Sequence, residues 1–218
     1  MIKNKNCTII PIKSLAEGKK RLETFLSPNE RKNLILSLLK DVLTAATSSK
    51  LTDKALLITP DSEIVKITKQ WNLPKLEYII EPVAKGINHA VQRALKWCIS
   101  QNISSILIIP ADIPLVKSND IDELIHLGQT KDSIIVVPSH RKDGTNAFYQ
   151  KLPHVVNVWY GEDSFQKNLE SISNQDISYL VLEKDVFALD IDLKEDLEKI
   201  QQINDSSETS LFVKTLNL

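Results

Sequence analysis

Residues 105–115 read Ser-Ile-Leu-Ile-Ile-Pro-Ala-Asp-Ile-Pro-Leu and are the best guide to the fold. The aliphatic run is continuous rather than alternating, which is typical of a strand buried on both faces of a parallel sheet. It leads into one carboxylate, Asp112, held between Pro110 and Pro114. Ligands of open α/β sheets bind beyond the carboxyl ends of the strands, so Asp112 is a candidate functional residue. The alternative is a structural turn, because Asp and Pro are both common in turns.

Strand-like segments recur along the rest of the chain, and most are separated by segments of helical length. This alternation indicates an α/β fold with a mostly parallel central sheet flanked by helices. The first helix is the best defined, since Ser27 and Glu30 form a capping box around Pro28. The expected strands are 8–12, 55–59, 78–80, 106–109, 134–137 and 179–182. The first expected helix begins at residue 28, and further helices are expected at 88–100, 118–127, 163–172 and 193–203.

The composition fits one globular domain. The 218 residues are 42% hydrophobic, so we assign residues 1–218 to a single domain, with 204–218 as a loosely attached C-terminal tail. With 27 Lys and Arg against 28 Asp and Glu, no overall field favours nucleic acid or a membrane surface. No apolar run approaches the ~20 residues of a membrane span, and no signal-peptide core is present. The two cysteines have no metal-ligand spacing, so we expect buried thiols and a cytoplasmic protein.

A basic loop follows the first expected strand. Residues 11–22 hold four cations, at Lys13, Lys19, Lys20 and Arg21, in the position where α/β folds bind phosphate. Neither the P-loop pattern nor the dinucleotide-binding glycine pattern is present, so side chains would have to bind the phosphates. Arg can do so by a bidentate fork and Lys as a mobile point charge. The alternative is an ordinary solvated basic loop.

A second acidic element lies near the end of the chain. Residues 188–197 read Ala-Leu-Asp-Ile-Asp-Leu-Lys-Glu-Asp-Leu, which predicts a short strand that enters a helix. Asp190 and Asp192 would share one face of that strand, and either could approach Asp112. Converging carboxylates repel each other, so a divalent cation such as Mg²⁺ would complete the site. Asp192 with Glu195 also fits a helix cap, which makes Asp190 the stronger candidate ligand.

Three shorter polar segments are weaker candidates. Residues 85–90 precede a helix, where Gly86 allows close approach and Asn88 offers a donor and an acceptor to a base or ribose. Residues 143–146 are turn-like, and residues 161–165 open a helix. Both could present hydroxyl and amide donors to a small anion. Each is equally consistent with an ordinary turn or helix cap.

The ordered series of these segments resembles one enzyme family over nearly the whole chain, from about residue 9 to residue 197. The segments are Ile10–Lys13, Gly18–Leu22 with Ser27-Pro28, Gly86–Asn88, Pro110–Leu115, Gly144–Ala147, Gly161–Phe165 and Leu189–Asp192. They look like the 2-phospho-L-lactate or phosphoenolpyruvate guanylyltransferase family of coenzyme F420 biosynthesis. The resemblance implies a single-domain, glycosyltransferase-A-like (Rossmann-like) nucleotidyltransferase. Such an enzyme uses GTP and Mg²⁺ and joins GMP to a phosphorylated three-carbon acid, releasing pyrophosphate.

The resemblance also implies a role for each matching position. Asp112 is implied both as a catalytic residue and, with Asp190, as a metal ligand. The other implied roles are triphosphate binding and catalysis for Lys13, Lys19 and Arg21, nucleotide binding for Gly86 and Asn88, and acceptor binding for Thr145, Gly161 and Ser164.

The chain departs from the family pattern at Arg141–Gly144, where the family usually has a richer glycine run, so the acceptor is not fixed among phospholactate, phosphoenolpyruvate and phosphoglycerate. The alternatives are a nucleotidyltransferase of the same fold with a molybdopterin or sugar-phosphate acceptor, and a non-catalytic nucleotide-binding module. The oligomeric state is open, with a homodimer as a possible assembly.

Overall fold

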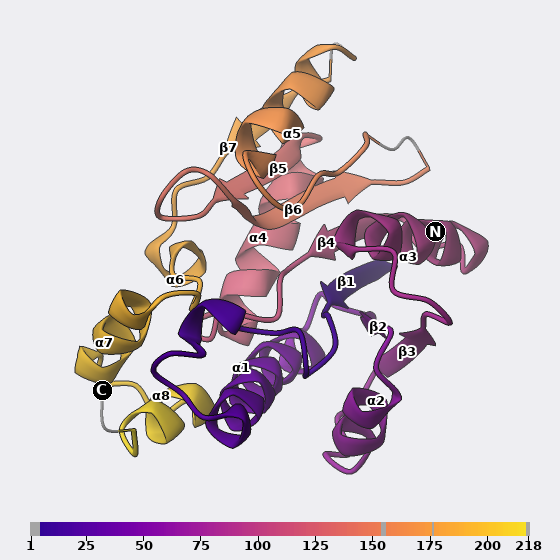
Figure 1. The fold of residues 1–218 in the computed structure, drawn as a ribbon. Coiled ribbons are helices and arrows are strands. Elements are labelled where there is room, and N and C mark those ends of the chain that lie inside the picture. Colours follow the sequence, from indigo (N-terminus) through magenta and orange to yellow (C-terminus); the bar gives the residue numbers. More distant parts are fainter. Residues whose placement is uncertain (1–4, 154–155, 176, 217–218) are drawn as a thin grey trace.

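The computed structural model describes residues 5–153, 156–175 and 177–216. A seven-stranded sheet with the order β3-β2-β1-β4-β6-β5-β7 runs through the molecule (Figure 1). Neighbouring strands pair in parallel except at β6, which is antiparallel to both β4 and β5. The predicted α/β architecture is therefore confirmed. The strands are β1 (Asn6–Pro11), β2 (Lys54–Thr59), β3 (Leu76–Ile80), β4 (Ser105–Ile108), β5 (Ile134–Pro138), β6 (Thr145–Lys151) and β7 (Tyr179–Val181).

Helices cover both faces of the sheet. One buried cluster joins the sheet to α1, α2, α4 and α6, and another joins its other face to α3 and α5. The helices are α1 (Pro28–Ser48), α2 (Ser62–Lys69), α3 (Ile87–Ser100), α4 (Ser118–Lys131), α5 (Ser164–Ser173), α6 (Asp185–Ala188), α7 (Lys194–Gln202) and α8 (Glu208–Val213), with a 3₁₀ turn η1 (Lys20–Leu22). Among the described residues, none of these helices has the length and apolar character to cross a membrane.

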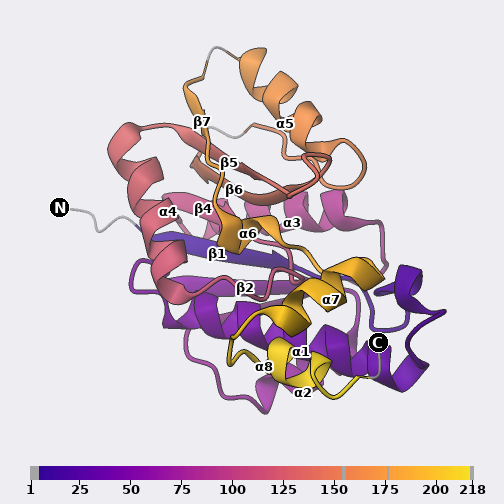
Figure 2. The ribbon, with the colours of Figure 1, turned by 90° about the vertical axis from the view of Figure 1, so that its left-hand side faces the viewer.

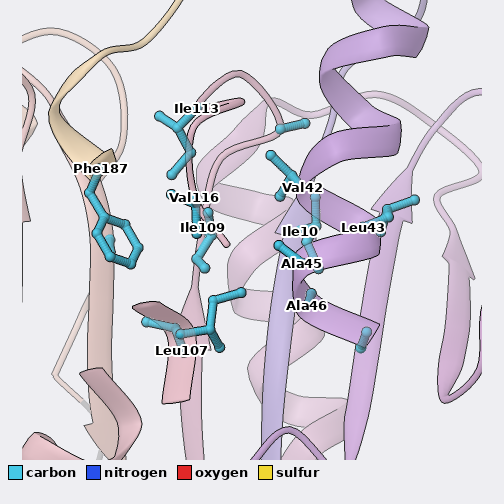
Figure 3. Packing of buried hydrophobic residues seen from close by; sticks show 14 of the residues in the cluster. Ile10, Val42, Leu43, Ala45, Ala46, Leu107, Ile109, Ile113, Val116 and Phe187 are labelled. Carbon is cyan, nitrogen blue, oxygen red and sulfur yellow. The ribbon is translucent and has the colours of Figure 1, made fainter. Parts of the chain in front are cut away.

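The central strands explain why residues 105–109 are apolar without alternation. On β4, Ile106 and Ile108 pack into the cluster on the α3 side, while Leu107 packs into the cluster on the α1 side. Figure 3 shows Ile10 of β1 next to Val42 and Ala45 of α1, and Leu107 belongs to the same cluster. Burying each such side chain contributes about 1.5–3 kcal/mol. A strand covered on both faces needs apolar residues at every position, as predicted.

The start of α1 confirms the capping box. The Glu30 N–H donates to Ser27 Oγ at 3.3 Å, and the Ser27 N–H donates to Glu30 Oε2 at 2.8 Å. Helix α2 was not predicted, although Asp61 caps it by accepting from the N–H of Glu63 at 2.9 Å. Both cysteines are free and buried, as expected.

Two segments differ from their predicted conformation. Residues 145 and 146, expected in a turn, begin β6 as buried polar residues, so hydrophobic alternation gave no sign of a strand there. The expected short strand at 189–192 is irregular chain instead. The N–H of Ile191 donates to the carbonyl of Asp112 at 3.0 Å, so the segment 189–192 pairs with the loop after β4 and not with a strand.

The expected loose tail is packed through residue 216, and residues 217–218 lie outside the described part. Val213 of α8 is fully buried in a third cluster, together with Leu34 and Leu38 of α1 and Leu197 of α7. The first N–H groups of α8 are also tied to α1, since Asp41 accepts from Glu208 N and Thr209 N at 2.9 and 2.8 Å. Figure 2 shows α8 lying against α1, with α7 next to α8. This contact was not predicted because residues 204–210 are mostly polar, which favoured a loosely attached tail.

Candidate active site

A cleft of about 830 Å³ opens at the carboxyl edge of the sheet, beside the junction of β1 and β4. The strand order reverses at this junction, which is where open α/β sheets bind ligands. Four parts of the chain supply its polar lining: the loop after β1, the loop after β4, the segment around β6 and the start of α5, and the loop between α6 and α7. Ile35 and Leu38 of α1 and Ile87 of α3 add apolar surface. The lining side chains include Lys13, Lys19, Lys20, Arg21, Asp112, Arg141, Thr145, Asn146, Tyr160, Ser164, Asp190 and Asp192.

Lys19 joins two acidic segments at the centre of this cleft. Its Nζ donates to Asp112 Oδ2 at 2.8 Å and to Asp192 Oδ1 at 2.7 Å, and the side chain is only 9% exposed. Burial opposes the charge on Lys19, but the two carboxylates outweigh it and raise the pKa of Lys19. Lys19 has a left-handed backbone, with φ 53°, which costs a residue with a side chain about 1 kcal/mol. The ion pairs hold this conformation.

The three carboxylates of the cleft are not equivalent. Asp192 is paired with Lys19, whose charge overcomes the effect of burial and lowers the pKa of Asp192. Asp190 accepts from Nδ2 of Asn146 at 3.4 Å rather than from Lys19, and burial together with the charges of Asp112 and Asp192 raises its pKa. The predicted helix cap at Asp192 is wrong, because Asp196 accepts from the N–H groups of Asp192 and Leu193 at 3.1 and 2.9 Å.

Asp196 also anchors Arg141. Nη2 of Arg141 donates to both carboxylate oxygens of the fully buried Asp196, at 2.8 and 3.0 Å. Burial alone would raise the pKa of Asp196, but these hydrogen bonds and the backbone donors hold it below the ordinary value. Nη1 of Arg141 then lies 3.8 Å from Asp190 Oδ2. The turn between β5 and β6 is thus tied to the start of α7 at the edge of the cleft.

Two hydroxyls come together at the side of the cleft formed by β6 and α5. Thr145 Oγ1 accepts from Nδ2 of the buried Asn168 at 2.9 Å. Ser164 begins α5, and its hydroxyl is buried without a hydrogen-bond partner among the described residues. Gly161, with φ 102°, makes the turn that precedes this helix. The residues implied in acceptor binding therefore gather in one place.

Asn88 has a different environment from the one predicted. Its Oδ1 accepts from the N–H of Tyr160 at 2.7 Å, and its Nδ2 donates to the carbonyl of Tyr160 at 3.2 Å. Both ends of the amide are thereby used inside the protein, whereas the prediction had them facing a base or ribose. Gly86, with φ 89°, precedes α3 and is exposed. Neither Gly86 nor Asn88 belongs to the cleft lining, although Ile87 between them does.

Sequence reasoning missed three residues that shape the site. Tyr160 stands directly before the Gly161 segment, and its hydroxyl is buried in the cleft wall without a partner among the described residues. Burial, and then the charge of Asp112, raise the pKa of Tyr160. Asn168 lies four residues after Ser164, on the same face of α5, a spacing that could have drawn attention to it. Arg141 stands next to Lys142 in a turn, and nothing local in the sequence distinguishes the two.

A family model and individual relatives place the chain in the same protein family. Residues 6–218 match the family model described as guanylyl transferase CofC like. The chain is 33% identical over 210 residues to a 2-phospho-L-lactate guanylyltransferase of Methanocaldococcus vulcanius, covering 96% of this chain and 90% of the relative. It is 28% identical to a phosphoenolpyruvate guanylyltransferase of Sphaerobacter thermophilus, covering 88% and 90%.

Solved structures share the fold at low sequence identity. A protein of Desulfovibrio desulfuricans G20 aligns with a TM-score of 0.80 and 14% identity, covering 97% of this chain and 95% of the other. A cytidylyltransferase of Leptospira borgpetersenii aligns with a TM-score of 0.59 and 14% identity, covering 97% and 93%. The architecture is therefore that of the nucleotidyltransferases, as expected.

Proposed function

Because the chain belongs to the CofC-like guanylyl transferase family, we propose that it transfers GMP from GTP to a phosphorylated three-carbon acid in coenzyme F420 biosynthesis. The acid is 2-phospho-L-lactate or phosphoenolpyruvate, the groups that appear in the names of the relatives. The observation that supports this reaction best is the meeting of Lys19 and Asp112 in one cleft with the hydroxyl donors of β6 and α5. Such a cleft offers separate places for a triphosphate and a smaller anion.

In this reaction a phosphate oxygen of the acceptor attacks the α-phosphorus of GTP. The new P–O bond forms as the bond to the β-phosphate oxygen breaks, so pyrophosphate leaves and a diphosphate diester remains. The attacking phosphate is already ionised near neutral pH, so neither a protein nucleophile nor a strong general base is required. The main difficulty is to bring two anions together in line.

The cations of the loop after β1 address this difficulty on the nucleotide side. Lys13, Lys19 and Arg21 all line the cleft, and we assign them to the triphosphate and the departing pyrophosphate. Lys19 is held in place by two carboxylates before substrate arrives, so its charge needs little reorganisation. Lys13 and Arg21 are exposed and can adjust to the phosphates.

A magnesium ion is the second part of the proposal, with Asp112 and Asp190 as its protein ligands. Oδ1 of Asp112 is buried without a hydrogen-bond partner among the described residues, and burial together with the charges of Asp112 and Asp192 raises the pKa of Asp190. No group of three or more His, Cys, Asp or Glu in the described part is placed to hold a metal. Two carboxylates still fit Mg²⁺, which often takes its remaining ligands from water and substrate phosphates. When bound, the ion would neutralise charge on the α-phosphate.

The test is a matrix of reactions in which the purified protein is incubated with each nucleoside triphosphate and each acceptor. The acceptors are 2-phospho-L-lactate, phosphoenolpyruvate and 3-phosphoglycerate, with and without Mg²⁺, and product mass and pyrophosphate release are measured. We expect a product from GTP with at least one acceptor, and only when Mg²⁺ is present. Absence of pyrophosphate release with every pair would overturn the proposal, and product without Mg²⁺ would overturn the metal assignment alone.

We also propose that the protein is cytoplasmic and forms a homodimer, as expected from the sequence. Gel filtration of the purified protein tests the dimer, and elution at the mass of a single 24.6 kDa chain would contradict it.

A further inference from the structure

Tyr160 carries a buried hydroxyl that no interaction within the protein explains. The residue is 8% exposed, lines the cleft, and its Oη has no hydrogen-bond partner among the described residues. Buried hydroxyls are normally satisfied, and leaving one without a partner lowers stability. A phenylalanine would fill the same space without this penalty. A ligand that enters the cleft would supply the missing hydrogen-bond partner of this hydroxyl.

The backbone around Tyr160 is held on both sides by asparagine amides. Asn88 of α3 makes two hydrogen bonds to the main chain of Tyr160, and Asn168 of α5 makes two to that of Trp159, at 2.8 and 2.9 Å. The Tyr160 ring also packs into the core cluster on the α3 side of the sheet. The hydroxyl is thus carried by a fixed ring, as a substrate-positioning group requires.

The surroundings of Tyr160 connect it with the acceptor side of the cleft. It immediately precedes Gly161, whose carbonyl accepts from Ser164 N at 3.2 Å, so Tyr160 and the Ser164 hydroxyl flank one turn. Asn168 joins this turn to Thr145 by donating to its hydroxyl. The cations of the loop after β1 belong to a different wall. At neutral pH a phenol is a hydrogen-bond donor, and donors beside Ser164 suit an anionic oxygen.

We propose that the Tyr160 hydroxyl binds the acceptor by donating a hydrogen bond to one of its anionic oxygens. Tyr160 is then a further substrate-binding residue of the cleft, beside Thr145 and Ser164. This inference rests on the proposed guanylyl transfer, because it takes its ligand to be the phosphorylated three-carbon acid of that reaction.

The test is Tyr160→Phe, which keeps the packed ring and removes only the hydroxyl. A hydrogen bond from a neutral donor to a charged oxygen corresponds to about 10- to 100-fold in affinity. We expect kcat/KM for 2-phospho-L-lactate to fall by that factor, while the KM for GTP stays within about twofold. The melting temperature should be unchanged or higher, because the variant loses an unsatisfied buried group.

Tyr149→Phe is the matched control. Tyr149 is fully buried on β6, its hydroxyl lies near Ser105, and it does not line the cleft. Its substitution should leave both substrates' kinetics unchanged. A loss of similar size in both variants would show a general effect on folding or packing and would overturn the assignment of Tyr160.

Calorimetric titration of 2-phospho-L-lactate and of phosphoenolpyruvate into wild type and Tyr160→Phe measures acceptor binding without turnover, and so separates the role of Tyr160 from the proposed function. Active wild type with unchanged acceptor affinity in the variant would overturn this inference and leave the proposed function standing. A rise in the KM for GTP alone would also overturn it. Wild type that neither binds nor converts any of the phosphorylated acids would overturn both.

Discussion

The loop between β1 and α1 and the segment from β6 to α5 border the same cleft with different chemistry. The first brings Lys13, Lys19, Lys20 and Arg21 from one stretch of chain, whereas the second brings the neutral hydroxyls of Thr145, Tyr160 and Ser164. In the proposed reaction the nucleoside triphosphate carries more charge than the phosphorylated acid, so these unequal walls would give each anion its own side. The acidic residues between them set how closely the two anions can approach. Substitutions in the two walls and between them test this difference.

Asp112→Asn should have the largest effect, since Asp112 lies between the two walls. We expect turnover to fall by about a hundredfold or more, roughly 3 kcal/mol, as for loss of a preorganised electrostatic contact. Steady-state pyrophosphate release measures this effect. Asp192→Asn is the matched control, because it also removes a carboxylate bonded to Lys19. Near-normal Mg²⁺-dependent turnover in Asp112→Asn would contradict the role of Asp112. Equal losses in both variants would contradict the preference for Asp190 over Asp192.

Lys19→Met should destabilise the fold and should also weaken the binding of GTP. Removing one member of a buried ion pair typically costs 3–5 kcal/mol. Asp112 and Asp192 remain 28% and 36% exposed, so we expect about 2 kcal/mol in the free energy of unfolding, measured by urea denaturation. The KM for GTP should rise at least about tenfold. Lys20→Met, in the same loop but exposed, is the control. Equal stability of the two variants would show that the Lys19 pairs contribute nothing.

Asp196→Asn should have an intermediate effect that depends on pH. The folded-state pKa of Asp196 is lowered, so its stabilising contribution is present above the unfolded pKa of about 3.9 and is lost as pH falls through the lower folded value. We expect a stability difference of about 1–2 kcal/mol between wild type and variant at pH 7, shrinking as pH falls below about 4. Urea unfolding at several pH values measures it. A difference that does not change with pH would show that the carboxylate charge is unimportant.

Arg21→Gln should have the smallest effect on stability. The Arg21 side chain is 73% exposed and lies 3.8 Å from Asp192, a geometry worth less than about 0.5 kcal/mol. The KM for GTP should rise about threefold at low ionic strength and approach the wild-type value in high salt, because exposed charges are screened. The acceptor KM should not change. A change in the acceptor KM alone would place Arg21 on the other side of the cleft.

The sequence was sufficient to predict the α/β fold and much of the charged wall. The apolar run at 106–109 indicates burial on both faces directly, and Asp112 lies in the loop that follows the end of β4 at Ile108. Lys19 follows from its place in the loop after the first strand. These features depend on local pattern and on the order of elements, which a sequence displays.

The other wall could not be predicted from local pattern because distant contacts create it. Asn88 looked like a ligand-binding side chain, but Tyr160, 72 residues later, uses both ends of its amide. Asp190 and Asp192 were expected on one strand face, yet their segment follows the backbone of Asp112 and Asp192 pairs with Lys19. An orphan hydroxyl such as that of Tyr160 can be recognised only when everything around it is known.

Strand β6 runs against its neighbours, and this reversal has a consequence for how such a cleft can diversify. A parallel strand reaches the ligand edge at its far end, after its pairing is complete, whereas β6 begins there at Thr145. The hairpin turn that precedes it, residues 139–144, can therefore change in length or composition while the crossover helices keep their lengths. Arg141 stands in this turn. Exchanging this short piece between relatives would change one border of the cleft without changing the strands and helices that support it.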